Sequence, residues 1–162
     1  MLQDLKTKVS AGQIRLSDAL SSALPDFRGK IPDDRLMWLV NEMQGYPNAL
    51  DWYSRPMQDF PPYRVVAGQL KLVDREGNMG DVNHPLAQRQ QYFLAAPVSW
   101  LEEAANMPGS VAMVEMQELS SYFKTAGGVA CLCNKDEIKR ILNSFRQSFL
   151  ALIDEVLTRG PA

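Results

Sequence analysis

Residues 64–73, RVVAGQLKLV, decide the fold, because they form the clearest strand in a chain that otherwise shows helical spacing. Alternate residues of this stretch are apolar and share one face, with Gly68 among them. These apolar residues are Val66, Leu70 and Leu72. Residues 74–78, DREGN, are typical of a turn and predict a partner strand near residues 79–82. The stretch therefore indicates a small, mainly antiparallel sheet.

Three amphipathic helices are expected before this strand. The first stops near Gly12, and Pro25 is expected to end the second. The third has Pro32 in its first turn and ends at Gly45, since glycine enters the left-handed region without a steric penalty. Residues 47–63 then contain prolines and aromatic residues, which favour an ordered loop over a central strand.

The second half of the chain mixes short strands and helices. Residues 97–105 predict a helix, residues 111–114 and 129–132 predict short strands, and residues 119–123 predict a helical turn. The last helix, residues 135–158, would be about 36 Å long. We therefore expect one α+β domain over residues 1–162, with helices at both ends, a small sheet and a long C-terminal helix.

The composition excludes several classes of protein. The net charge is −2, which is opposite to the balance of a generally basic nucleic-acid binder. One histidine and two cysteines are too few soft ligands for a structural zinc site, and we expect no metal and no cofactor. No run is long and apolar enough to span a membrane, and the first ten residues do not resemble a signal peptide. We expect a cytoplasmic protein with no membrane contact.

The single histidine and the two cysteines each have both a functional and a structural interpretation. His84 could act as a general base near Asp81, or it could be a polar residue in a turn. Cys131 and Cys133 would share one face of a strand and could form a redox or metal pair, or they could be small core residues. The structural interpretation is favoured for both, because neither a nucleophile motif nor further soft ligands accompany them.

Aromatic and charged residues gather around the loop of residues 47–63. Arg64 and Glu42, which falls outside the apolar stripe of its helix, could pair because their elements must approach one another. The set is either a buried anchor for the loop or a recognition surface, and the anchor is favoured. Its members are Trp38, Glu42, Tyr46, Trp52, Tyr53, Tyr63 and Arg64.

Two motifs in this region resemble those of the AbiTii domain of bacterial abortive-infection proteins. A helix ends in Glu42-Met43-Gln44-Gly45-Tyr46, with Met43 where leucine is more usual in the family. After an irregular stretch, Pro62-Tyr63-Arg64 leads into the strand. The order of helices and strands along most of the chain agrees with that family, although the C-terminal half is the weaker match. The resemblance implies that residues 1–162 form a single AbiTii-like domain.

The resemblance implies a role in defence against phage. In the family the domain resembles an accessory or sensing module, and it supplies no catalytic residue to assign here. We expect a non-enzymatic interaction or sensing module that acts through protein contacts. The alternatives are a small toxin-like enzyme such as a nuclease, and a nucleic-acid sensor. The sensor would use a local basic stripe of Lys135, Lys139, Arg140 and Arg146.

The C-terminal helix carries an apolar stripe that looks wider than one sheet would cover. Its members are Ile138, Leu142, Phe145, Phe149, Leu152 and Val156, with Ile141, Ile153 and Leu157 beside them. We expect Phe145, Phe149 and Leu152 to form an interface in a homodimer or with a partner defence protein.

Overall fold

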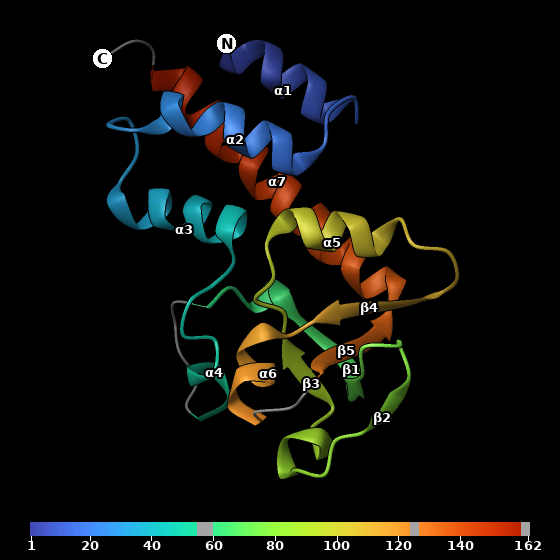
Figure 1. Ribbon diagram of the computed structural model, residues 1–162. Helices are drawn as coiled ribbons and strands as arrows, with labels where there is room; N and C mark the ends of the chain where they lie inside the picture. The colour runs from blue at the N-terminus through green and yellow to red at the C-terminus, as the bar shows by residue number, and fades with distance from the viewer. Residues whose placement is uncertain (55–59, 124–126, 160–162) are drawn as a thin grey trace.

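The computed structural model describes residues 1–54, 60–123 and 127–159. Figure 1 shows a helical end, which contains both the N-terminus and the end of α7 (Lys135–Arg159), and a sheet at the opposite end. The α+β fold with helices at both ends, a small antiparallel sheet and a long C-terminal helix is confirmed. Residues 55–59 of the expected loop lie outside the described residues.

The sheet is built on β1 (Val65–Val73), as the sequence predicts. Its strands follow the order β2-β1-β5-β4, and every pair is antiparallel. The first residues of β1 pair with β3, and its last residues pair with β2 along the same edge. The other strands are β2 (Met79–Asp81), β3 (Gln91–Phe93), β4 (Val111–Glu115) and β5 (Gly128–Asn134).

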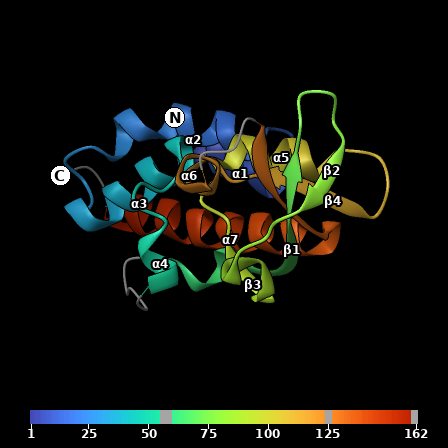
Figure 2. The same ribbon diagram turned by 60° about the horizontal axis from the view of Figure 1, so that its bottom comes forward.

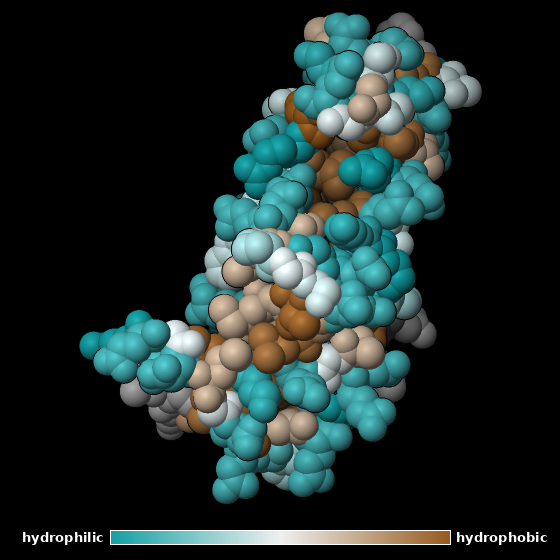
Figure 3. Space-filling model, turned by 90° about the vertical axis from the view of Figure 1, so that its right-hand side faces the viewer, coloured by the Kyte–Doolittle hydropathy of each residue, from teal (hydrophilic) through white to brown (hydrophobic). Residues whose placement is uncertain are grey.

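One face of the sheet is covered and the other is open. The covered face packs into a core with α5 (Val98–Ala105), α6 (Gln117–Phe123) and the start of α7. The strand registers place Met79, Val111 and Met113 on the opposite face, where they are exposed. Figure 3 shows apolar atoms gathered there, beside the polar hairpin that projects to the left.

The helical end has its own core. It is formed by α1 (Leu2–Ser10), α2 (Leu16–Phe27) and α3 (Asp33–Gln44), packed against the second half of α7. Ile138 and Ile141 near the start of α7 belong to the core under the sheet. The helix therefore joins both cores, and Figure 2 shows it running along the length of the molecule. The short helix α4 (Asp51–Ser54) and the 3-10 turns η1 (Pro62–Arg64) and η2 (Pro85–Gln88) lie in the connections.

The expected interface on α7 is wrong. Phe145, Phe149 and Leu152 are fully buried within the chain itself. Phe27 of α2 meets Phe149 edge-on at 6.1 Å, and Trp38 of α3 lies 5.5 Å from Phe145 between ring centroids. The stripe looked too wide for one sheet because its second half is covered by the N-terminal helices. Any surface for a partner must lie elsewhere.

The end of α2 differs from the sequence prediction. Helix α2 continues past Pro25 to Phe27, because Phe27 is fully buried against α7 and packing holds the last turn in place. The first turn of α2 is capped from a distance, since the carboxylate of Glu102 on α5 accepts from the backbone N–H groups of Leu16 and Ser17. No helix in the described ranges is both long and apolar enough to cross a membrane.

The two cysteines of β5 are buried and unbridged, in agreement with the core interpretation. Gly68 faces Cys133 across the β1–β5 pair. A Cβ at Gly68 would lie 2.7 Å from the carbonyl oxygen of Leu132 and 2.8 Å from Sγ of Cys131. Both contacts are closer than atoms tolerate, so the glycine is required by its neighbours rather than by its backbone angles.

We predict that Gly68→Ala lowers the free energy of unfolding by about 1–3 kcal/mol, because the added methyl group must displace backbone as well as a thiol. Gly80→Ala is the matched control, since Gly80 is also in a strand of this sheet and has no atom near the new Cβ. Chemical denaturation followed by circular dichroism measures both. Equal stabilities of the two variants would contradict the steric argument.

Candidate functional site

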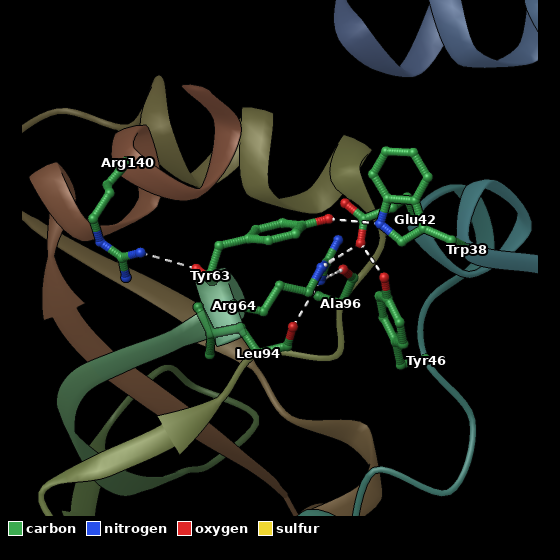
Figure 4. Close-up of polar contacts among 8 residues, drawn as sticks. All are labelled: Trp38, Glu42, Tyr46, Tyr63, Arg64, Leu94, Ala96 and Arg140. Atoms are coloured by element: carbon green, nitrogen blue, oxygen red, sulfur yellow. Dashed lines mark hydrogen bonds and ion pairs between the residues drawn. The ribbon is translucent and has the colours of Figure 1, made fainter. Parts of the chain in front are cut away.

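Arg64 is the centre of the motif region, and its side chain has no exposure to solvent. It ends η1, whose first residue, Pro62, has its φ angle restricted by its ring. The guanidinium donates from Nε to Oε2 of Glu42 at 2.7 Å. It also donates from Nη1 to the carbonyl oxygens of Leu94 at 2.7 Å and Ala96 at 2.6 Å. Figure 4 shows Arg64 lying between α3 and the segment that leads into α5.

Glu42 is fully buried, although the helical pattern placed it outside the apolar stripe. Its Oε2 accepts from Arg64 and from the hydroxyl of Tyr46, which lies at 2.5 Å. The Arg64 guanidinium also lies 4.9 Å from the centroid of the Tyr46 ring, within range of a cation–π contact. The expected pairing of Arg64 with Glu42 is confirmed.

The outer part of this network joins three elements. Trp38 of α3 donates from Nε1 to the hydroxyl of Tyr63 at 2.9 Å. Arg140 of α7 donates to the carbonyl oxygens of Tyr63 at 3.0 Å and Val65 at 2.7 Å. The motif at the start of β1 is therefore held by α3 on one side and by α7 on the other (Figure 4).

The structure also explains why residue 45 is a glycine. Its φ is +98°, a conformation that side chains disfavour, and a Cβ there would lie 3.1 Å from the carbonyl oxygen of Ala95. The next residue, Tyr46, donates its N–H to that same carbonyl at 2.9 Å. The end of α3 is thus tied directly to the segment that Arg64 also binds.

The electrostatics of the network suit an anchor. Burial, followed by the nearby Glu42 carboxylate, raises the pKa of the Tyr46 and Tyr63 phenols far above their usual value, so both stay protonated. Burial acts to lower the pKa of Arg64, but the charge and hydrogen bond of Glu42, together with Tyr46 and Tyr63, raise the pKa overall. Oε1 of Glu42 and Nη2 of Arg64 have no partner among the described residues. The guanidinium, the Glu42 carboxylate and the Tyr46 hydroxyl are thus engaged with one another and with backbone carbonyls inside the fold.

A cavity of about 560 Å³ opens beside this network, between the end of α3, the start of α5 and α6. Gly45 and Tyr46 of the motif form part of its wall. Met37 of α3 stands at its edge with 57 % exposure, and it also borders an adjoining hollow of about 460 Å³. Sequence reasoning missed this cavity, because its walls come from segments that are far apart along the chain.

The far wall of the cavity is aromatic and acidic. Trp100 contributes from α5, Glu115 from the end of β4, and Glu118 from α6. Oε1 of Glu118 is buried and has no hydrogen-bond partner in the described part of the chain. Burial raises the pKa of Glu118, because desolvation penalises its charged form.

His84 and Asp81 each have another partner. Nδ1 of His84 accepts from the backbone N–H of Leu86 and caps η2, while its ring packs 4.8 Å from that of Phe123. Asp81 is paired with Lys71 at 2.7 Å. Both line a hollow of about 490 Å³. The interpretation of His84 as a turn residue agrees with this geometry.

The proposed basic stripe on α7 is partly occupied by internal contacts. Lys135 donates to the carbonyl oxygen of Met107, and Arg140 binds carbonyl oxygens near the start of β1. Nε of Arg146 is buried without a partner among the described residues. In the same residues no group of three or more His, Cys, Asp or Glu side chains is arranged to hold a metal ion.

Comparisons of the chain with protein-family models, curated proteins and solved structures found no match. The resemblance to the AbiTii domain therefore depends on the residues of the two motifs. What the structure adds is that these motifs, 20 residues apart in sequence between Glu42 and Pro62, meet in one network.

We predict that Arg64→Ala lowers the free energy of unfolding by about 3–5 kcal/mol, because it leaves the Glu42 carboxylate buried without its cation. Arg35→Ala is the control, since its ion pair with Glu155 is partly exposed and should contribute about 1 kcal/mol or less. Denaturant unfolding measures both. If Arg64→Ala were as stable as wild type while function was lost, a binding role would replace the anchor.

A pH-dependent effect is expected at Glu118. A carboxyl with a raised pKa in the folded state stabilises the protein at low pH, and that contribution is lost as the pH rises through the raised value. Glu118→Gln should therefore melt at a higher temperature than wild type near about pH 7 and at a similar temperature below about pH 4. Glu103→Gln, at an exposed position of α5, should change little at either pH. A Glu118→Gln protein less stable than wild type near neutral pH would contradict this account.

Proposed function

We propose that this chain is a non-enzymatic interaction module of a bacterial antiviral defence system, acting in the cytoplasm through protein contacts. The motifs that resemble the AbiTii domain support the defence role. The geometry of their residues supports the non-enzymatic part, because the motif side chains are engaged with one another and with backbone carbonyls.

The observation that carries the proposal is the cavity beside the motif network. Gly45 and Tyr46, two residues of the first motif, belong both to the network and to the cavity wall. The buried ion pair therefore positions a surface hollow as well as a loop. The motif therefore also shapes a surface to which another molecule can bind.

The chemistry of the cavity fits a protein partner. Its walls combine apolar groups such as Met37, Pro97 and Trp100 with a few polar side chains. Aromatic and methionine side chains are enriched at protein interfaces, and concave sites with a few polar groups fix the orientation of what they bind. The partner is either a separate defence protein or a second copy of this chain, and its contact surface is this cavity rather than the buried stripe of α7.

A phage challenge tests the proposal. Cells that express the gene with its natural neighbours should lower phage plating, and Met37→Lys should remove that protection, because it places a charge at the apolar edge of the cavity. Met107→Lys is the matched control, since Met107 is 44 % exposed at the opposite end of α5 and should keep protection. Circular dichroism should show both variants folded.

Three outcomes would contradict the proposal. If the wild-type gene, expressed with its natural neighbouring genes, gave no protection against phage, the defence role would be contradicted. Loss of protection in Met79→Lys but not in Met37→Lys would move the contact to the open face of the sheet. Loss in Asp81→Ala and His84→Ala, together with magnesium-dependent nuclease activity, would favour the toxin-like enzyme.

A further inference from the structure

His84 is the only histidine in the chain, and its ring joins two elements of the fold. Nδ1 accepts from the backbone N–H of Leu86 at 3.1 Å, and this hydrogen bond caps η2. Between ring centroids, His84 lies 4.8 Å from Phe123 and 5.7 Å from Tyr122, both in α6. One half-buried side chain therefore holds the turn before β3 against α6.

The capping bond fixes the protonation state of this ring. A backbone N–H group can only donate, so Nδ1 of His84 must present its lone pair and the ring proton lies on Nε2. A second proton would occupy that lone pair, and two donors would then face each other. The cap can therefore exist only while His84 is neutral. Histidine is the side chain whose ordinary charge change lies between about pH 5 and pH 8.

The charged groups around His84 are engaged elsewhere. The hollow beside the ring contains Asp81 of β2 and Lys71 of β1, and these two form an ion pair at 2.7 Å. From α6 the contacts are aromatic rings, while Glu118 of that helix lies in the wall of the cavity toward α3. Arg89, which follows η2, donates to a backbone carbonyl oxygen of α4. A proton on Nδ1 therefore removes the cap without a new ion pair to replace it.

The turn that His84 caps reaches into the core. Leu86 and Ala87 are half-buried and pack against the core under the sheet. The carbonyl oxygen of Leu86 accepts from the hydroxyl of Tyr92 in β3 at 2.8 Å. Residues 82–88 also supply most of the described wall of the hollow of about 490 Å³. Loss of the cap would therefore change the shape of this hollow.

We propose that His84 is a pH-sensitive cap, which holds η2 against α6 while its ring is neutral and releases the turn when Nδ1 takes a proton from the solvent. The N–H of Leu86 then bonds to water, and the wall of the hollow moves. The change is reversible, because only a proton is exchanged. This inference is independent of the proposed function, since the cavity beside α3 is lined by other residues.

NMR spectra of the ¹⁵N-labelled full chain test the proposal, when they are recorded from about pH 8 to about pH 5 at constant ionic strength. The readout is the shift of the Leu86 amide proton, which reports the capping hydrogen bond. We expect this signal to move upfield as the pH falls, together with changes in the ring signals of Tyr122 and Phe123.

His84→Asn is the matched control. Oδ1 of asparagine can accept the same bond, and asparagine is a preferred capping residue, but its amide gains no proton in this range. The Leu86 signal should stay at the capped position in His84→Asn and at the uncapped position in His84→Ala throughout. Wild type should resemble the asparagine variant at high pH and the alanine variant at low pH.

Two outcomes would overturn the pH-sensitive cap. One is a wild-type Leu86 signal that stays at the capped position down to about pH 5, whether or not the ring has gained its proton. The other is a Leu86 signal that moves equally with pH in His84→Asn, which would assign the change to another group. Wild type and His84→Asn are sufficient for this decision, so the proposal remains testable even if the alanine variant fails to fold.

Discussion

A guanidinium group that is cut off from water must find acceptors within the protein, and this requirement at Arg64 constrains the centre of the molecule. Its acceptors come from α3 and from the segment between β3 and α5. Those segments must stay in place relative to the start of β1, or a charge is left buried without a partner. Because Gly45 and Ala95 meet at the same point, the position of α3 also sets one wall of the cavity.

Helix α7 provides the second link between the two halves of the fold. Its first turns pack under the sheet, its later turns pack between the N-terminal helices, and Arg140 binds carbonyl oxygens at the start of β1. The cavity therefore lies among elements that are fixed by an ion pair and by two cores. A surface hollow with such support can keep its shape without a ligand, which lowers the entropic cost of binding.

The sequence was sufficient where local pattern and packing agree. Alternation identified β1, and the stripe of α7 identified the longest helix. Helical periodicity placed Glu42 on the surface, which was wrong. An acidic residue off the apolar stripe is normally exposed, and the pattern of one helix cannot reveal an arginine from elsewhere in the chain that pairs with it. At Phe145 and Phe149 the periodicity identified buried positions, but it could not tell what covers them, since the helices that do so lie at the other end of the chain. The cavity had no sequence signal, because Tyr46, Trp100 and Glu118 come to line one space only after folding.

Hydrogen exchange of Glu42→Gln against wild type tests most directly whether the buried pair holds α3 to the sheet. The substitution keeps the shape of residue 42 and removes the charge that Arg64 needs. The account predicts faster exchange at the end of α3 and in residues 92–96, with unchanged protection where α1 packs on α7. Protection equal to wild type at Tyr46 and Leu94, the residues whose N–H groups close this junction, would contradict the central role of the pair.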